Sequence, residues 1–304
     1  MAVSNGDLLS YHGALARQQF DPTHKHMASS PASDLEAFRS AEHSGWQAKV
    51  AAYDRYWSPL TTELGEHLLD GAAVGPAKRV LDVACGPGRV AAAAAARGAE
   101  VVGVDFSDRM VAHARTLFPA LDVRHAEAES LPFADESFDA VIVNFGVLHF
   151  ARPDCAMVEA HRVLKPGGRL GFTLWAGPAD HAGMRLMFDA IEAHGRVDAP
   201  LPEGPPQFLF TEPRACATLL TTAGFDGPGI DHHLVRSTWR LPAPDGLFAA
   251  YADGAVRIAL LLAAQRPAAL AAIREAVSRA CQAYATNGDL RIPVAADVVT
   301  AVRP

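Results

Sequence analysis

The segment VLDVACGPGRVA, residues 80–91, combines a glycine-rich turn with an acidic residue. Gly86 and Gly88 separate an apolar run from an alanine-rich run, and Asp82 lies inside the apolar run. Glycines let the backbone approach a ligand closely, and the start of a following helix offers N–H donors. Asp105 follows 19 residues after Gly86, where a carboxylate can accept hydrogen bonds from both hydroxyls of a ribose. These residues predict a site for a ligand that contains a nucleoside.

The charge of Asp82 separates two classes of ligand. The G-x-G-x-x-A pattern of residues 86–91 fits a dinucleotide, so an NAD-dependent oxidoreductase is one alternative. A carboxylate near the loop would repel a pyrophosphate. S-adenosyl-L-methionine (SAM) has no phosphate and carries an ammonium and a sulfonium group. Asp82 therefore favours SAM over NAD.

The elements that must position this loop alternate between strand and helix. Helical patterns lie between apolar runs, which predicts right-handed βαβ units and a parallel sheet covered on both faces. The predicted strands are 79–84, 100–105, 122–126, 139–145 and 169–175. The predicted helices among them are 89–97, 107–117 and 154–164. The later part predicts a helix at 211–225, a strand at 230–241, helices within 245–286 and a final strand at 294–304.

The same patterns suggest a domain organisation. Residues 1–45 are polar and rich in turn-forming residues, which predicts an N-terminal arm or lid. A helix is expected from Trp46, where apolar side chains recur at helical spacing. Residues 46–244 are expected to form the ligand-binding core, 245–290 a helical cap insertion, and 291–304 the last strand of the core sheet.

Several segments resemble one known family. Asp82-x-Ala84-x-Gly86-x-Gly88 resembles motif I of the class I SAM-dependent methyltransferases. Residues 101–110, 126–150 and 162–170 resemble further motifs of its ubiquinone/menaquinone-biosynthesis branch, including L-P-F and S-F-D. The resemblance covers about residues 46–175. It implies a Rossmann-like α/β fold with a seven-stranded sheet, mostly parallel, whose last strand is antiparallel.

The resemblance also implies roles for individual residues, with SAM as the cofactor. Asp82 is the acid of motif I, and the loop residues that follow it line the methionine part of SAM: Ala84, Gly86 and Gly88. Asp105 holds the ribose. The residues expected near the adenine are Phe106, Met110, Glu127, Ala128 and Glu129, where Glu129 is an alternative to Glu127. Asn144 is expected to face the sulfonium or the methionine, and Tyr53 to close over the cofactor.

The expected reaction is methyl transfer to a small organic molecule, and specialised metabolism is the expected setting. His149, just after the fourth strand, is the candidate general base, and a histidine that only fixes the loop is the alternative. Trp175 ends the fifth strand and is a candidate floor of the acceptor pocket, with burial in the core as the alternative. The tetrad that begins at Asn144 lacks the N/D-P-P-Y/F pattern of methyltransferases that act on adenine or glutamine amides. A second alternative is a protein of this fold with a non-methylating or binding role.

Composition limits the partners. The chain has 304 residues and a net charge of −7, which disfavours nucleic acid and anionic membranes as partners. Its four cysteines include no C-x-x-C pair, so neither a metal site nor a disulfide framework is expected. We expect a cytoplasmic protein with a small-molecule acceptor. The oligomeric state is left open.

Overall fold

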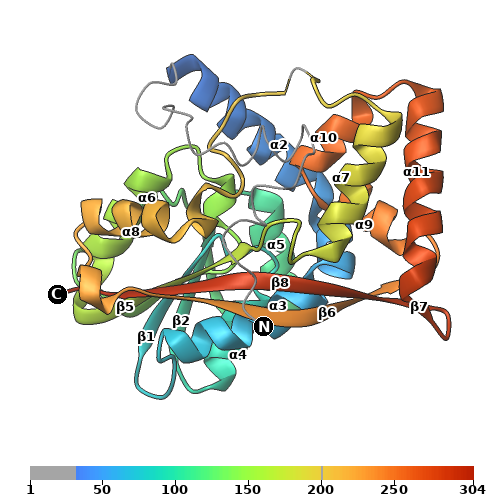
Figure 1. Ribbon diagram of the computed structural model, residues 1–304. Coiled ribbons are helices and arrows are strands. Elements are labelled where there is room, and N and C mark those ends of the chain that lie inside the picture. The colour runs from blue at the N-terminus through green and yellow to red at the C-terminus, as the bar shows by residue number, and fades with distance from the viewer. Residues whose placement is uncertain (1–31, 200) are drawn as a thin grey trace.

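A mixed β-sheet runs through the middle of the molecule, with helices on both faces (Figure 1). The computed structural model describes residues 32–199 and 201–304. The strand order is β3-β2-β1-β4-β5-β8-β6, and the short β7 pairs with β8. The strands are β1 Arg79–Val83, β2 Glu100–Asp105, β3 Asp122–His125, β4 Phe138–Val143, β5 Leu164–Trp175, β6 Asp231–Pro242, β7 Ala285–Thr286 and β8 Asp289–Val302.

The direction of the strands confirms the predicted sheet. β1 to β5 are parallel to one another, and β8 is antiparallel to both β5 and β6. The central strands are apolar on both faces because helices cover both. Leu81 and Val83 pack with one set of helices, whereas Val80 and Ile142 pack with the opposite set. The Rossmann-like class that the alternating pattern predicts is therefore present.

Ten α-helices lie within the described residues. α3 and α4 lie against one face of the sheet, and α6 and α8 lie against the other (Figure 1). The helices are α2 Ala32–Tyr56, α3 Ser58–Gly71, α4 Arg89–Ala96, α5 Asp108–Leu117, α6 Pro153–Val163, α7 Ala182–His194, α8 Pro213–Thr222, α9 Gly246–Gly254, α10 Arg257–Ala263 and α11 Pro267–Cys281. The predicted cap at Ser107 is present, because its hydroxyl accepts a hydrogen bond from the backbone N–H of Met110.

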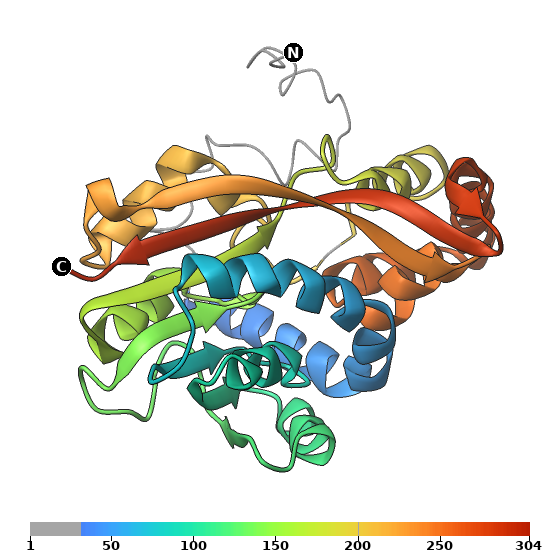
Figure 2. The same cartoon turned by 90° about the horizontal axis from the view of Figure 1, so that it is seen from below.

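The last two long strands extend well beyond the rest of the sheet. β5 pairs with β8 only from Ala296 onward, whereas β6 follows β8 back to Asp289. The last strand therefore begins earlier than the predicted 294. Figure 2 shows this ribbon along the length of the molecule, with α8 at one end and α7 and α11 at the other.

A second group of helices packs on the extended part of the ribbon. α7, α9, α10 and α11 gather at that end of the molecule (Figure 1). Ile273, Val277 and Cys281 lie at helical spacing in α11, and all three are buried. The predicted helical stretch 245–286 contains the three helices α9, α10 and α11. Among the described residues no single helix is long and apolar enough to cross a membrane. α9 and α10 reach that length and composition only when they are counted together, and they are bent by 99° relative to each other.

The N-terminal helix differs most from the prediction. α2 begins at Ala32 instead of near Trp46, and it continues without a break to Tyr56. It contacts α3, α5 and α9. A hydrogen bond from the Trp57 indole N–H to the Ala250 carbonyl (2.9 Å) ties its end to α9. Residues 1–31 of the predicted arm lie outside the described residues. The proposed domain boundaries stay a prediction.

Candidate active site

One large cavity lies where β1, β2, β4 and β5 end. Its volume is about 1450 Å³ including its open mouth, and α2 and the cap helices complete its wall. Every predicted site residue except Gly88 lies in its lining: Tyr53, Asp82, Ala84, Gly86, Asp105, Phe106, Met110, Glu127, Ala128, Glu129, Asn144 and His149. The carboxyl ends of parallel strands are where ligands bind in open α/β sheets.

The loop after β1 turns sharply through left-handed backbone. Ala84 has a φ of 56° and Gly86 a φ of 53°, a region that favours glycine. The turn directs the Gly86 N–H toward the Asp105 side chain, where it donates a hydrogen bond of 2.9 Å to Oδ2. This hydrogen bond thus connects the loop after β1 to the end of β2.

Gly88 lies behind the loop instead of in the cavity wall. It precedes α4 with a φ of 78°. A Cβ at this position would lie 3.1 Å from the Cβ of Ala114 in α5. Gly88 therefore allows α4 to begin close against α5, and the expected contact with the cofactor falls outside the lining that the structure shows.

Asp105 is buried and held from two sides. Its Oδ1 accepts a hydrogen bond of 2.8 Å from the Ser107 N–H, and its Oδ2 accepts the bond from Gly86. Burial raises its pKa to about 6, although both hydrogen bonds act in the opposite direction. Each carboxylate oxygen keeps further acceptor capacity. Asp105 can therefore receive two neighbouring hydroxyls of a ribose.

Asp82 is fully buried and lacks a hydrogen-bond partner. Neither of its carboxyl oxygens has one within residues 32–199 and 201–304. Burial and the charge of Asp105 raise its pKa to about 8, against a weaker opposite effect of the Ala91 backbone N–H. Asp82 is therefore mostly protonated at neutral pH, whereas the sequence-based reasoning treated it as charged. A cation in the cavity would favour its ionised form.

The two predicted adenine acids have partners in the protein. Glu127 forms an ion pair with Arg39 of α2. Glu129 accepts hydrogen bonds from the backbone N–H and the Nε of Arg152, both of 2.8 Å. Ala128 lies between them in the cavity lining. Both acids are thus engaged by arginines, and Glu127 joins α2 to the core.

Phe106 and Met110 lie on the same side of the cavity. Phe106 is half-buried and meets the ring of His43 edge-on at 5.4 Å. Met110 is buried in a small core with Trp46 and Val256. Met110 therefore contributes to packing between α5, α2 and the cap as well as to the cavity wall.

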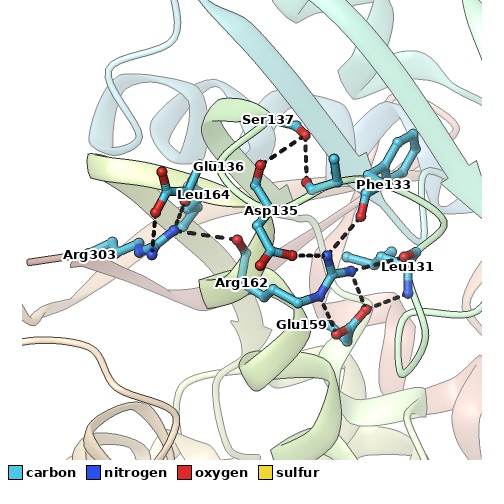
Figure 3. A network of polar contacts seen from close by, with 10 residues as sticks. Leu131, Phe133, Asp135, Glu136, Ser137, Glu159, Arg162, Leu164 and Arg303 are labelled. Atoms are coloured by element: carbon cyan, nitrogen blue, oxygen red, sulfur yellow. Dashed lines mark hydrogen bonds and ion pairs between the residues drawn. The ribbon is translucent and has the colours of Figure 1, made fainter.

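Arg162 contacts the L-P-F part, residues 131–133, of the segment that carried much of the family resemblance (Figure 3). Arg162 of α6 donates hydrogen bonds to the carbonyls of Leu131 (3.0 Å) and Phe133 (2.7 Å). It also pairs with Glu159 and Asp135. Both carbonyls belong to the L-P-F segment, so Arg162 fixes this segment next to residues 127–129. Residues 127–129 line the cavity, whereas the L-P-F segment does not.

Asn144 uses its amide within the protein. Its Nδ2 donates to the Thr61 carbonyl at 3.0 Å, and its Oδ1 accepts from the Thr173 hydroxyl at 2.9 Å. The same Thr173 oxygen accepts the Phe145 N–H at 2.8 Å. Asn144 therefore joins the end of β4 to α3 and β5, and its side chain forms part of the cavity wall.

His149 is held by a buried carboxylate that sequence reasoning missed. Its Nδ1 lies 2.9 Å from Oε2 of Glu42, which also accepts the Trp46 indole N–H (3.1 Å). Arg257 Nε donates to the other oxygen of Glu42 at 3.1 Å. Burial alone would raise the pKa of Glu42, but His149 and Arg257 outweigh it and hold the pKa below its ordinary value. Glu42 is thus a charged partner for Nδ1 of His149.

Four aromatic residues form the part of the cavity beyond β4 and β5. We call Trp57, Phe145, Trp175 and Tyr251 the aromatic chamber. Phe145 and Trp175 stack with their ring centroids 3.9 Å apart, and Trp57 lies 5.5 Å from Trp175. Trp175 thus lies in the cavity wall, as the sequence suggested. No group of three or more metal-ligating side chains occurs in the described part of the chain.

Comparison with known proteins identifies the central part of the chain. Residues 81–172 match the family described as methyltransferase domain. A demethylmenaquinone methyltransferase of Clavibacter sepedonicus is 41% identical over 122 residues, which are 38% of this chain and 46% of that protein. An uncharacterized protein of Mycobacterium tuberculosis is 33% identical over 149 residues, 48% of this chain and 54% of its own length. The chain spans about half the length of these curated relatives.

Solved structures agree on the fold. The [4+2]-cyclase SpnF superposes with a TM-score of 0.50 at 20% identity and covers 90% of this chain and 98% of its own. Protein BH2331 of Bacillus halodurans has a TM-score of 0.50 at 20% identity, and the match covers 79% of this chain and 98% of BH2331. At this identity the likeness concerns the fold alone, while the family match indicates SAM as the cofactor. Residues 81–172 therefore form a methyltransferase domain, and this part of the chain is similar to class I SAM-dependent methyltransferases of the ubiquinone/menaquinone-biosynthesis type.

Proposed function

We propose that this protein transfers a methyl group from SAM to a small organic molecule. The observation that carries the proposal is the pair of buried acids at the glycine loop. Asp105 offers two carboxylate oxygens that the backbone holds in position, and Asp82 offers a carboxyl group that has no hydrogen-bond partner among the described residues. SAM supplies hydroxyls for the first and a positive charge for the second.

The proposed binding mode assigns the cavity residues to parts of the cofactor. Asp105 accepts the ribose hydroxyls, and the loop from Ala84 to Gly86 borders the methionine part. Phe106, Met110 and the backbone at Ala128 border the adenine. Because Glu127 is paired with Arg39, its contact with the adenine amino group would be shared with that arginine. Tyr53 lies within 3.9 Å of where a Cβ of Gly86 would be, which supports its role as a cover.

His149 is proposed as a general base for an acceptor that carries a hydroxyl. Bound SAM would supply a methyl group that leaves its sulfur for the acceptor oxygen, and Nε2 of His149 would take up the proton of the acceptor hydroxyl. Glu42 is a positioning residue, because a carboxylate at Nδ1 keeps the proton on that nitrogen and leaves Nε2 as an acceptor. Such a base typically contributes about 10²- to 10⁴-fold in rate.

Calorimetry and turnover test the proposal together. We expect S-adenosyl-L-homocysteine (SAH) and SAM to bind to the purified chain and NAD not to bind. His149→Gln should lower kcat by about 10²-fold or more and leave the affinity for SAH within about twofold. Glu42→Gln should lower kcat and shift the pH profile. His233→Gln is the matched control, because His233 is exposed on β6 and pairs with Asp231.

Two results would contradict the proposal in different ways. Tight binding of NAD without a response to SAM or SAH would favour the oxidoreductase alternative. SAH binding without methyl transfer to any of a range of neutral hydroxylated acceptors would favour a protein that keeps the cofactor for another role. The expected cytoplasmic location of the protein is not addressed by these binding and turnover measurements.

A further inference from the structure

Arg257, the first residue of α10, holds both neighbours of the candidate base. Its Nε donates a hydrogen bond of 3.1 Å to Oε1 of Glu42, whose Oε2 lies 2.9 Å from Nδ1 of His149. Its Nη2 donates a hydrogen bond of 2.6 Å to the carbonyl of Leu148, one residue before His149 in the chain. Arg257 therefore fixes the imidazole from two sides, through its carboxylate partner and through the backbone that carries it.

The remaining contacts of Arg257 bring distant parts of the chain to this point. Its Nη1 donates to the Pro205 carbonyl at 3.0 Å, and its guanidinium carbon lies 4.6 Å from the centre of the Phe38 ring. Arginine suits this place because its planar guanidinium carries several donors in fixed directions. Arg257 and Glu42 both lie outside residues 81–172, which match the methyltransferase domain. The cap and α2 thus supply two members of the triad Arg257–Glu42–His149.

The positive charge of Arg257 bears on the proton that His149 has to accept. A carboxylate alone beside a histidine stabilises the imidazolium form, which cannot take a proton from an acceptor hydroxyl. Arg257 opposes this effect, because its charge lies next to the same carboxylate and disfavours a second positive charge on the imidazole. The side chain of Glu42 is 2% exposed and that of Arg257 is 16% exposed, so water screens the interaction only weakly.

The other charged groups around the triad do not replace Arg257. The Asp105 carboxylate acts on His149 from the end of β2 and favours the imidazolium form, as Glu42 does. The further charged side chains of the described lining are Arg39, Asp82, Arg89, Glu127 and Glu129. The two arginines among them pair with other carboxylates. Arg257 is therefore the arginine of the described lining that contacts the partner of the candidate base.

From these contacts we infer that Arg257 is a positioning residue, which aligns His149 and disfavours its protonated form so that Nε2 can accept a proton at neutral pH. The inference rests on the proposed function, because it concerns the base of the same reaction. It also gives the cap a role in the chemistry, since α10 has to contact both α2 and the loop after β4 for the base to be in its accepting form. Arg257 acts through Glu42 and Leu148 and not on the substrate.

An NMR titration of the histidines measures this effect without an acceptor. The full chain is labelled at its histidines, saturated with SAH and titrated, and the signal of His149 is the one that His149→Gln lacks. Arg257→Gln should raise the pH at which His149 is half-protonated by about 1–3 units, the usual effect of one charge within about 4–6 Å. Glu42→Gln should lower it, so the sign of the effect is tested even where one of the two variants does not fold.

Two matched variants separate the charge of Arg257 from its packing. Arg257→Lys keeps the positive charge but not the fixed directions of the donors, so it should move the titration of His149 clearly less than Arg257→Gln. Arg274→Gln is the control in the cap. Arg274 also pairs with a carboxylate, that of Asp245, and lies over the ring of Phe248, but it does not line the cavity. It should leave the titration of His149 as in the wild type.

The pH profile of kcat gives a second measurement. Formation of SAH is followed with SAM and a neutral hydroxylated acceptor that the wild type methylates. Arg257→Gln should lower kcat at pH 7 by up to about tenfold for each unit of the shift, because a smaller fraction of His149 is then neutral. It should regain much of this loss at about pH 9, whereas a variant that is only misfolded would not.

Equal titration of His149 in the wild type and in Arg257→Gln would overturn the inference, and so would equal shifts in Arg257→Lys and Arg257→Gln. The titration needs no reacting acceptor, so the two proposals fail in different ways. A shifted titration without methyl transfer to any hydroxylated acceptor supports the action of Arg257 on His149 and contradicts the proposed function. Methyl transfer with an unshifted titration and pH profile contradicts the assignment of Arg257 alone.

Discussion

Replacement of Asp82 by asparagine isolates the electrostatic role of this acid in ligand binding. Asparagine keeps the size of the side chain and removes its ability to ionise. The pKa of Asp82 in the ligand-free protein is about 8. At pH 7 the carboxyl group is therefore protonated in about nine of ten molecules, and Asp105, with a pKa of about 6, in about one of ten.

A bound ammonium or sulfonium group changes this balance. An opposite charge within about 4–6 Å lowers the pKa of a carboxyl group by about 1–3 units. A decrease of about 2 units would bring Asp82 to about 6 and release about 0.8 proton for each ligand bound at pH 7. By linkage, the affinity should then rise nearly tenfold for each pH unit between about 6 and 8 and level off above that.

Calorimetry in two buffers measures the released protons directly. Binding enthalpies of SAH are compared at pH 7 in phosphate and in Tris, which take up protons with different enthalpies. 5′-Methylthioadenosine serves as a matched ligand, because it keeps the nucleoside and the sulfur but lacks the ammonium and carboxylate. We expect proton release with SAH and little with methylthioadenosine. Asp82→Asn should abolish the release, and Asp122→Asn, at an exposed position of β3, should retain it.

The stability of the ligand-free protein independently tests the direction of the pKa shift of Asp82. The folded-state pKa of Asp82 lies above its ordinary value of 3.8, so the folded protein holds a proton that the unfolded chain has lost. Stability should therefore decrease as the pH rises from about 4 to about 8, and less so in Asp82→Asn. Proton release by Asp82→Asn equal to that of the wild type would refute the reasoning, since the released proton would then come from elsewhere.

Two further predictions concern the residues that hold the site. Asp105→Asn should weaken SAH binding about 10- to 150-fold, because a hydrogen bond to a charged acceptor is worth about 1.5–3 kcal/mol; binding within twofold of the wild type in calorimetry would exclude the ribose assignment. Arg162→Lys should lower the free energy of unfolding by about 1–3 kcal/mol in urea titrations, because lysine cannot reach both the Leu131 and Phe133 carbonyls and Glu159. Arg124→Lys, an exposed control, should change it by less than about 0.5 kcal/mol, and an equal effect of the two variants would exclude the role of Arg162 as a clamp.

The parts of the fold that depend on local signals could be predicted from the sequence. Apolar runs such as residues 139–143 and the cap at Ser107 determine their elements within a few neighbouring residues, and the structure has them in place. Motif I likewise lies at the cavity because a loop after a buried parallel strand must emerge there. These predictions required no knowledge of distant contacts.

The start of α2 could not be predicted because distant contacts hold it. The first part of this helix has few apolar residues, and its polar side chains gave the appearance of an arm. In the structure Arg39 reaches Glu127, and Glu42 reaches both His149 and Arg257. No spacing rule relates residues so far apart in the chain. The sequence alone therefore gives His149 as a candidate and does not reveal the Glu42 carboxylate that contacts its Nδ1.

The polar residues of the cavity fall into two groups, those that have partners within the described part of the protein and those that do not. Asn144, Glu129 and Glu127 have partners within the protein, so they shape the cavity and hold its loops. Within residues 32–199 and 201–304, the side-chain oxygens of Asp82 and Tyr251 have no hydrogen-bond partner, although both residues line the cavity. Because both groups look alike in the sequence, only the contacts separate them. One unpaired group lies at the glycine loop and the other in the aromatic chamber, and the proposed reaction requires two ligands that meet in one cavity.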